Sequence, residues 1–289
     1  MLRTIDHVVL PVSTLEAAAP FERIGISLTP SLRHAGQGTE NRVFFTGSAD
    51  GEFYVELLAA FDRTAAVAAM GEQFAPPANT AAGLQRVVFA CEDIDGIRVR
   101  LESAGIHVSE RTVSRDDGTV IGRVLMPATN AAGCSFGLID YAEPPEVRLQ
   151  RHGAAGLYQH AFPLKRLDHL AVIVHDLAKV TSFWTDVLGV PVFGEVPRPG
   201  SLIRQMKVGD AVLELIGPTE PGSPMLERPE ALISMCAYEV TDMAKAIELA
   251  RTAGFTCPDA APGPLPGTRV TTIPGAELTG LGLQLLEYV

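Results

Sequence analysis

The sequence contains one short pattern twice, and this duplication restricts the folds open to the chain. Residues 5–15 read IDHVVLPVSTL and residues 167–177 read LDHLAVIVHDL, at a constant separation of 162 residues. In both copies an Asp-His pair precedes a short apolar run and a helix start, which is typical of a strand followed by a helix. A repeated strand that opens with histidine predicts a repeated fold with a repeated site.

A second repeated pattern follows each copy of the first. Asp93 and Gly105 enclose one expected helix, and Asp242 and Gly254 enclose another, with matching residues 149 positions apart. Asp is a common N-cap and Gly a common helix stop. The chain therefore has four modules, each an expected strand and helix followed by hairpin-linked strands. Modules one to four cover residues 5–59, 84–141, 167–216 and 233–288.

A single module cannot cover its own sheet, so modules must pair. The expected fold is α+β, with two domains of curved, partly open mixed sheets, helices on the outside and a concave cavity inside. We place the first domain at residues 1–145, a linker at 146–165 and the second domain at 166–289. Pro144 and Pro145 stop the strand before the linker.

Charge and composition limit the kinds of binding partner that we expect. The net charge is −11 and no Lys/Arg cluster occurs, so we expect a small-molecule substrate rather than nucleic acid or a membrane. The lack of a long apolar run predicts a cytoplasmic protein, and a homodimer is compatible with the sequence. The four cysteines form no CxxC and are expected to be buried thiols.

Three motifs resemble the vicinal oxygen chelate superfamily, which includes glyoxalase I, methylmalonyl-CoA epimerase, extradiol dioxygenases and bleomycin resistance proteins. They are the [L/I]DH strand, the FWxxVLG run at 183–189, and an x-E-L strand that closes modules one and three. The RHAGQGTENR run at 33–42 is similar to a glyoxalase-like subgroup. The resemblance implies βαβββ modules, glyoxalase-type domains and a divalent metal ion (Zn, Ni, Mn, Fe or Co), with a metal-free form as the alternative.

The resemblance also implies where the metal ligands lie. In the family they come from the first and last strands of two paired modules. Module one offers His7 and Glu56, and module three offers His169 and Glu214. In module four the last-strand position is Gln284, while the first-strand position is Met235 or Ser234, and Met is a poor ligand for a hard cation.

The set of residues that could bind a metal depends on which modules pair, and the sequence leaves the pairing open. Modules three and four together would supply His169, Glu214 and Gln284. Modules one and four would supply His7, Glu56 and Gln284. Modules one and two would leave only His7 and Glu56, because their other positions are Arg86 and Gly137 and a cation repels a metal ion.

Each candidate has a structural alternative. His7 and His169 could instead be neutral imidazoles that Asp6 or Asp168 holds by a hydrogen bond at the start of a strand. The adjacency of Asp and His in the sequence does not itself show such a bond, because neighbouring side chains on a strand face opposite ways. Glu56 and Glu214 stand in apolar strands. Facing a cavity, each would be a metal ligand or general base, and facing outward each would be solvated.

Four polar residues are candidates for substrate binding. His34, Asn41 and Arg42 could line a pocket mouth, or form an ordinary polar turn. Arg86 could bind a carboxylate or phosphate with its guanidinium, or pair with Glu56 as a structural bridge.

The leading function hypothesis is a glyoxalase- or epimerase-like lyase or isomerase. Its metal would stabilise an enediolate of a small α-oxo, thioester or diol substrate while Glu214 or Glu56 moves the proton. A metal-free binding or resistance protein is the second hypothesis. An extradiol-type dioxygenase ranks lower, because its two-His site would need a histidine at Met235.

Overall fold

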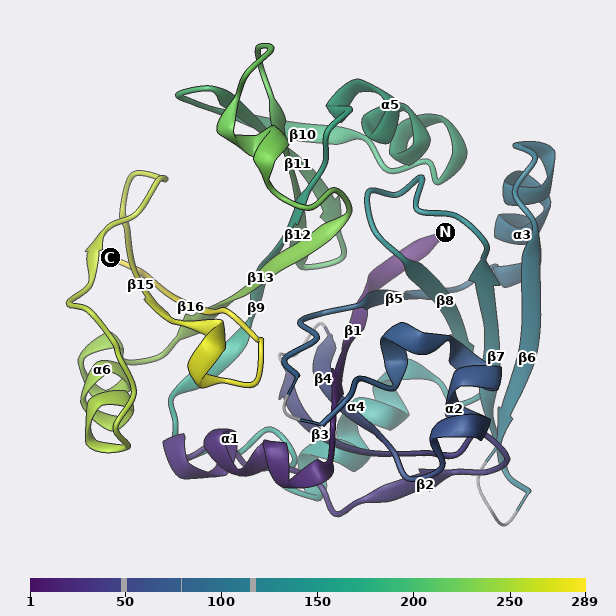
Figure 1. Cartoon of the computed structure of the whole chain (residues 1–289), viewed down its shortest axis with the longest axis horizontal. Helices are drawn as coiled ribbons and strands as arrows, with labels where there is room; N and C mark the ends of the chain where they lie inside the picture. The colour runs from purple at the N-terminus through teal and green to yellow at the C-terminus, as the bar shows by residue number, and fades with distance from the viewer. Residues whose placement is uncertain (48–50, 79, 115–117) are drawn as a thin grey trace. The chain divides into compact units, whose positions relative to one another are not determined.

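The computed structural model describes residues 1–47, 51–78, 80–114 and 118–289. Within these residues the strands form two eight-stranded mixed sheets, the first from modules one and two and the second from modules three and four (Figure 1). The strand orders are β2-β3-β4-β1-β5-β8-β7-β6 and β10-β11-β12-β9-β13-β16-β15-β14. The two orders match position for position, which confirms the predicted α+β fold with duplicated halves.

Modules one and two each begin with a strand and a helix, as predicted. The elements of module one and the segment after it are β1 (Leu2–Val12), η1 (Leu15–Ala18), α1 (Ala19–Ile24), β2 (Leu32–His34), β3 (Thr39–Gly47), β4 (Glu52–Ala60), α2 (Arg63–Met70) and η2 (Glu72–Phe74). Those of module two are β5 (Arg86–Cys91), α3 (Ile94–Ser103), β6 (Val108–Ser114), β7 (Val120–Pro127) and β8 (Phe136–Tyr141).

Modules three and four repeat this order after helix α4 (Pro145–Ala154). The elements of module three are β9 (Leu164–Ile173), α5 (Leu177–Ser182), the π-helical turn η3 (Phe183–Val187), β10 (Val192–Arg198), β11 (Ser201–Val208), β12 (Ala211–Pro218) and η4 (Pro224–Glu227). Those of module four are β13 (Leu232–Val240), α6 (Met243–Thr252), β14 (Ala261–Pro262), β15 (Thr268–Ile273), η5 (Gly275–Glu277) and β16 (Leu283–Tyr288).

The chain divides into two compact units that do not follow the order of the modules. Unit 1 consists of Met1–His7, Arg86–Arg148 and His169–Ser234, and therefore contains modules two and three. Unit 2 consists of Val8–Gln85, Leu149–Asp168 and Met235–Val289, and contains modules one and four. The sequential domain boundaries stay a prediction.

Aromatic rings from modules two and three share the core of unit 1. The rings of Phe89 and Trp184 lie 5.3 Å apart, and those of Phe136 and Phe183 lie 5.9 Å apart. The indole N–H of the buried Trp184 donates to the carbonyl of Ala132 at 3.0 Å, which satisfies its polar edge. Phe183 and Trp184, the first two residues of the FWxxVLG run, are thus core residues.

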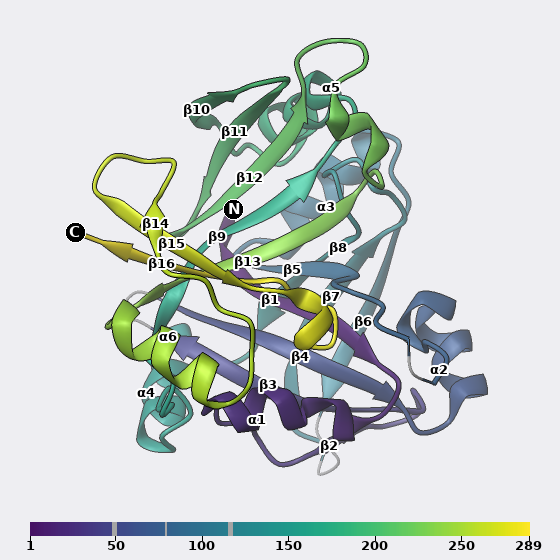
Figure 2. The same ribbon diagram turned by 60° about the vertical axis from the view of Figure 1, so that its left-hand side comes forward.

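Modules one and four share the core of unit 2 in the same way. The ring of Phe44 packs between Phe21 of α1 at 5.6 Å and Tyr238 of β13 at 6.3 Å. Helix α1 runs along β3 (Figure 2). A hydrogen bond from Thr279 to the carbonyl of Ala17, 2.9 Å long, ties the two modules together at the surface of this core.

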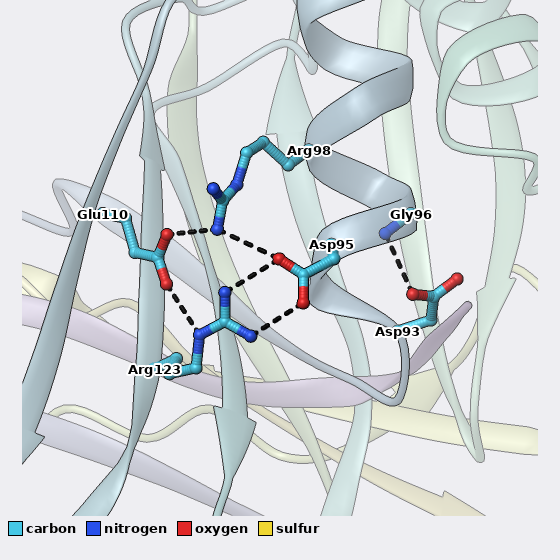
Figure 3. Close-up of polar contacts among 6 residues, drawn as sticks. All are labelled: Asp93, Asp95, Gly96, Arg98, Glu110 and Arg123. Carbon is cyan, nitrogen blue, oxygen red and sulfur yellow. Dashed lines mark hydrogen bonds and ion pairs between the residues drawn. The ribbon is translucent and has the colours of Figure 1, made fainter.

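Helix α3 is fixed at its start and along its solvent side. The Asp93 carboxylate accepts from the Gly96 N–H at 2.9 Å, which confirms the predicted N-cap. Beyond the cap, two acidic and two basic side chains from α3, β6 and β7 form a surface ion network (Figure 3). Its members are Asp95, Arg98, Glu110 and Arg123.

Three features differ from the sequence-based expectation or complete it. The edge strands β2, β6, β10 and β14 carry no clear apolar alternation in the sequence, because most of their side chains are exposed or only half-buried. The expected linker contains helix α4, where Pro145 occupies the first position and needs no N–H partner. Among the described residues no helix is both long and apolar enough to cross a membrane.

Candidate functional site

Unit 1 brings together one histidine and one glutamate from the predicted ligand set. Strand β12 pairs with β9 so that Val212 lies opposite His169 and Glu214 lies opposite Ala171. His169 and Glu214 are therefore diagonal neighbours on one face of the sheet. The Nε2 of His169 lies 3.8 Å from Oε2 of Glu214, and the two side chains are only 13% and 12% exposed.

A glutamine that the sequence analysis did not select holds this carboxylate. Gln205 of β11 lies directly opposite Glu214 of β12, and its Nε2 donates to Oε1 of Glu214 at 2.8 Å. One carboxylate oxygen is thus bound by the amide, and the other is directed to the imidazole of His169. The hydrogen bond from the Gln205 amide therefore fixes the orientation of the Glu214 carboxylate.

The His169–Glu214 pair fits two ligands of one divalent ion. Donor atoms bound at about 2.0–2.2 Å lie at most about 4.2 Å apart, so a separation of 3.8 Å needs no movement of the backbone. Gln284, the third predicted ligand, belongs to unit 2, where its strand position is opposite Ala237 and Thr272. No cluster of three or more His, Cys, Asp or Glu in the described part of the chain could hold a metal.

The other predicted histidine, His7, contacts the aspartate beside it. The Nδ1 of His7 lies 2.7 Å from Oδ2 of Asp6, and both residues are buried. This contact is the one that the structural alternative for His7 describes, an imidazole held at a strand start by Asp6. This contact directs Nε2 of His7 away from the carboxylate. Its predicted co-ligand Glu56 belongs to unit 2.

Both aspartates of the two DH motifs bind a tyrosine from a later strand. The Tyr141 hydroxyl at the end of β8 donates to Asp6 at 2.9 Å, and the Tyr288 hydroxyl at the end of β16 donates to Asp168 at 2.8 Å. Burial and the Asp168 carboxylate raise the pKa of Tyr288 to about 12. The guanidinium of Arg148 lies 3.5 Å from the Tyr141 ring centroid. The Asp that occurs in both DH repeats of this chain therefore has a structural role.

Unit 2 contains a second polar cluster, built from β2, β3 and β4. Asn41 donates from Nδ2 to Oε1 of Glu56 at 2.6 Å, and the same nitrogen lies 3.2 Å from Nε2 of His34. The Nε2 of His34 is itself 3.6 Å from Oε1 of Glu56. The other ring nitrogen of His34 lies 2.9 Å from the hydroxyl of the fully buried Thr39.

The two predicted arginines each have a described partner that is not a member of this cluster. Arg42 follows Asn41 on β3, so its side chain emerges on the opposite face of the sheet. There it donates to the Thr29 carbonyl at 2.9 Å and to Glu22 at 2.6 Å, and it holds the pKa of Glu22 below its ordinary value. Arg86 belongs to unit 1, where its Nε donates to the Ser135 hydroxyl at 3.3 Å.

Gln205, Tyr141 and Tyr288 were not predicted as site residues from the sequence. Gln205 lies in a strand whose side chains are mostly half-buried, and only its register against Glu214 marks it. Tyr141 and Tyr288 do carry a signal, because each ends the last strand of its module. Aligning the last strands of modules two and four shows a tyrosine at the same position in both.

Comparison with known proteins supports the fold described above. A family model described as the glyoxalase-like domain matches residues 5–160, more than half of the chain, and one described as the glyoxalase/bleomycin resistance protein/dioxygenase superfamily matches residues 168–272. The chain therefore belongs to the glyoxalase-like domain family. No single activity follows from this membership, because one fold of this kind carries many chemistries.

Two curated relatives and one solved structure are similar to parts or all of the chain. The mitochondrial methylmalonyl-CoA epimerases of Mus musculus and Bos taurus are 42% identical over 64 residues and 32% identical over 100 residues, or 22% and 33% of this chain. The matches span only 36% and 57% of those relatives. A triple mutant of 4-hydroxymandelate synthase from Streptomyces coelicolor shares the fold, with a TM-score of 0.62 and 14% identity over 100% of this chain and 93% of that one.

Proposed function

We propose that the chain is a metal-dependent lyase or isomerase of glyoxalase or epimerase type, acting on a small α-oxo, thioester or diol substrate. The observation that carries this proposal is the 3.8 Å separation between Nε2 of His169 and Oε2 of Glu214 in unit 1. Both residues stand at the ligand positions that the family resemblance implies. The similarity of part of the chain to methylmalonyl-CoA epimerases supports an enolisation reaction.

In this proposal His169 and Glu214 would hold a divalent ion. The other two family positions in unit 1 are Gly137 and Arg86, whose Nε donates to the Ser135 hydroxyl, and neither supplies a ligand, so the remaining coordination positions would be left to substrate and solvent. Such an ion supplies a Lewis acid for the carbonyl oxygen on which negative charge develops. Gln205 keeps one oxygen of Glu214 in place, so the carboxylate has a fixed direction. Glu214 is also the group that we propose takes the proton from the carbon beside the carbonyl, because it is the carboxylate of this pair and lies 3.8 Å from His169.

The first test is the metal content of the purified protein. Protein produced with Zn, Ni, Mn, Fe and Co supplied should lose one bound ion per chain on His169→Ala. The matched control is His175→Ala, since His175 is partly exposed and its Nε2 contacts the Arg228 carbonyl at 2.9 Å, away from the predicted ligands. Equal metal content in the His169→Ala variant and the wild-type protein would contradict the proposal.

The second test is catalytic. Glu214→Gln keeps the size of the side chain but removes the base and weakens the ligand, so exchange of the α-proton of methylmalonyl-CoA with deuterated water should fall by at least about 100-fold. Other α-oxo and thioester compounds belong in the same assay, because the relatives named above cover only part of this chain. Exchange that continues at the wild-type rate in Glu214→Gln would exclude Glu214 as the base.

A further inference from the structure

Strand β12 of unit 1 has one face against helix α5 and an opposite face that stays partly exposed. Leu215 is fully buried, and a methyl group added to Gly217 would lie 2.7 Å from Cβ of Leu177 in α5. Glu214 and Ile216 alternate with these residues, so their side chains emerge on the other face, where both are partly exposed. The carboxylate of the candidate pair thus lies on a sheet face that a ligand can reach.

Strand register places Glu214 between a lysine and two isoleucines on this face. Lys207 of β11 is two residues after Gln205, the partner of Glu214, and Ile203 is two residues before it, opposite Ile216. Residues two apart on a strand share a face and lie about 6.6 Å apart, so about 13 Å separates Lys207 from Ile203 along β11. Lys207 is exposed, and the two isoleucines are partly exposed. The face therefore has a positive charge on one side of the carboxylate and aliphatic carbon on the other.

The matching face of module one shows what covers such an apolar position. Leu58 stands two residues after Glu56, as Ile216 stands two residues after Glu214. Leu58 is fully buried in a cluster with Phe74 of η2. In module one, therefore, a phenylalanine of the chain itself packs at the apolar position beside the carboxylate.

Module three leaves the corresponding position of Ile216 partly exposed. In residues 219–231, all of which the structure describes, the helix that follows β12 is η4, and none of its residues is buried. This segment therefore has no buried counterpart of Phe74. A partly exposed aliphatic surface beside a polar site favours an apolar group of a ligand, because that group loses contact with water on binding.

We propose that the site of unit 1 takes an anionic substrate that carries a branched aliphatic chain, and this inference rests on the function proposed above. The charged group binds the ammonium of Lys207, the chain packs on Ile203 and Ile216, and the carbon that loses its proton lies beside Glu214. An aliphatic 2-oxo acid carries its carboxylate and its chain on opposite sides of the carbonyl group. This class of compound therefore matches the order of the three groups along the sheet.

The test measures equilibrium binding to the full-length, metal-supplied protein by titration calorimetry. The probes are 4-methyl-2-oxopentanoate, its neutral amide, and pyruvate, which keeps the charge but lacks the branched chain. Wild-type protein should bind 4-methyl-2-oxopentanoate at least about 10-fold more tightly than either of the other two probes. Equal affinity for the three probes, or no binding of 4-methyl-2-oxopentanoate, would overturn the inference.

A substitution of the lysine tests the charged contact. Lys207→Met should lower the affinity for 4-methyl-2-oxopentanoate about 10-fold and leave the affinity for its amide unchanged, because only the acid carries a charge for the ammonium. Lys179→Met is the matched control, since Lys179 is an exposed lysine of α5, and it should alter neither affinity. A Lys207→Met variant with the wild-type preference for the acid would contradict the inference.

Two substitutions of Ile216 test the apolar contact. Ile216→Phe places a ring at the position that Phe74 covers in module one, and Ile216→Ala removes the aliphatic surface. Each should weaken the binding of 4-methyl-2-oxopentanoate about 10-fold and leave pyruvate unaffected. If both folded variants, checked by circular dichroism, keep the wild-type preference for the branched chain, the chain does not pack on Ile216.

Proton exchange in deuterated water separates this inference from the proposed function. In that exchange the proton on carbon 3 passes to Glu214 while the electron pair of the C–H bond moves toward the carbonyl oxygen, and return of a deuteron restores the 2-oxo acid. If Lys207 and Ile216 control binding but no exchange occurs, the proposed reaction fails and the binding inference stands. If exchange depends on Glu214 while Lys207→Met binds the acid as wild-type protein does, the reaction stands and the inference fails.

Discussion

The hydroxyl of Tyr141 donates a hydrogen bond to the fully buried carboxylate of Asp6 at 2.9 Å, 135 residues away in the chain. Tyr288 makes the same contact with Asp168 at 2.8 Å. The duplicated DH motif thus supplies two anchors as well as two histidines. Each anchor joins the first strand of one module to the end of the last strand of the following module, and it fixes the aspartate next to the candidate ligand.

Tyr141→Phe should destabilise the protein more than Tyr288→Phe. Removing a donor from a buried carboxylate costs about 1.5–3 kcal/mol, and Asp6 is wholly buried. Tyr288 is 50% exposed, so water can replace its hydroxyl at Asp168. Urea unfolding of the two variants measures both losses. An equal or reversed order would show that the other partners of Asp6, His7 at 2.7 Å and Arg148 at 3.5 Å, suffice without Tyr141.

The stability of the protein should fall as the pH drops through the range of His160. Its Nδ1 accepts from the Ser27 N–H at 3.1 Å and its Nε2 lies 2.7 Å from the Phe45 carbonyl, so the folded state requires the neutral ring. Burial lowers the pKa of His160. A lowered histidine pKa means that the unfolded chain binds the proton more readily, so stability is full above about pH 6.5 and is lost below it.

The control for this effect is His160→Gln, which cannot gain a proton. Urea unfolding between about pH 7.5 and 5 should give a shallower pH dependence for the variant than for the wild-type protein, by at most about 1.4 kcal/mol per pH unit. Other histidines titrate equally in both proteins and cancel in the difference. Parallel curves would show that His160 does not control this pH range.

The four cysteines should resist thiol reagents while the protein is folded. All four are buried, and burial raises the pKa of both Cys91 and Cys134 to about 12. At pH 8 very little reactive thiolate is present. Labelling with a chromogenic disulfide should therefore be slow in buffer and should reach four thiols per chain in denaturant. Rapid labelling of one thiol in buffer would reveal local opening at that residue.

Gln205→Leu should weaken the ion site that we propose in unit 1. Losing the donor to Oε1 frees Glu214 to rotate, and such supporting contacts change metal affinity by about 10–100-fold. Gln73→Leu is the matched control, because Gln73 is exposed on η2. Competition with a chelating dye measures both affinities. Unchanged affinity in Gln205→Leu would mean that Glu214 is held by its strand alone.

The sequence by itself determined the four modules, the helix caps and the central strands. Its periodic apolar residues specify which strand face is buried, and local signals such as Asp93 or Gly25 specify where helices begin or end. It also identified His169 and Glu214, because the two copies of the module place them at matching positions. These are short-range or repeated properties, so they can be read without a structure.

Only the tertiary structure decided which residues meet. Strand register places Gln205 of β11 directly opposite Glu214 of β12. The combination of modules two and three, and of modules one and four, in compact units depends on aromatic contacts such as Phe89 with Trp184. Such contacts join residues far apart in the chain, and no local pattern of hydrophobicity or propensity specifies them.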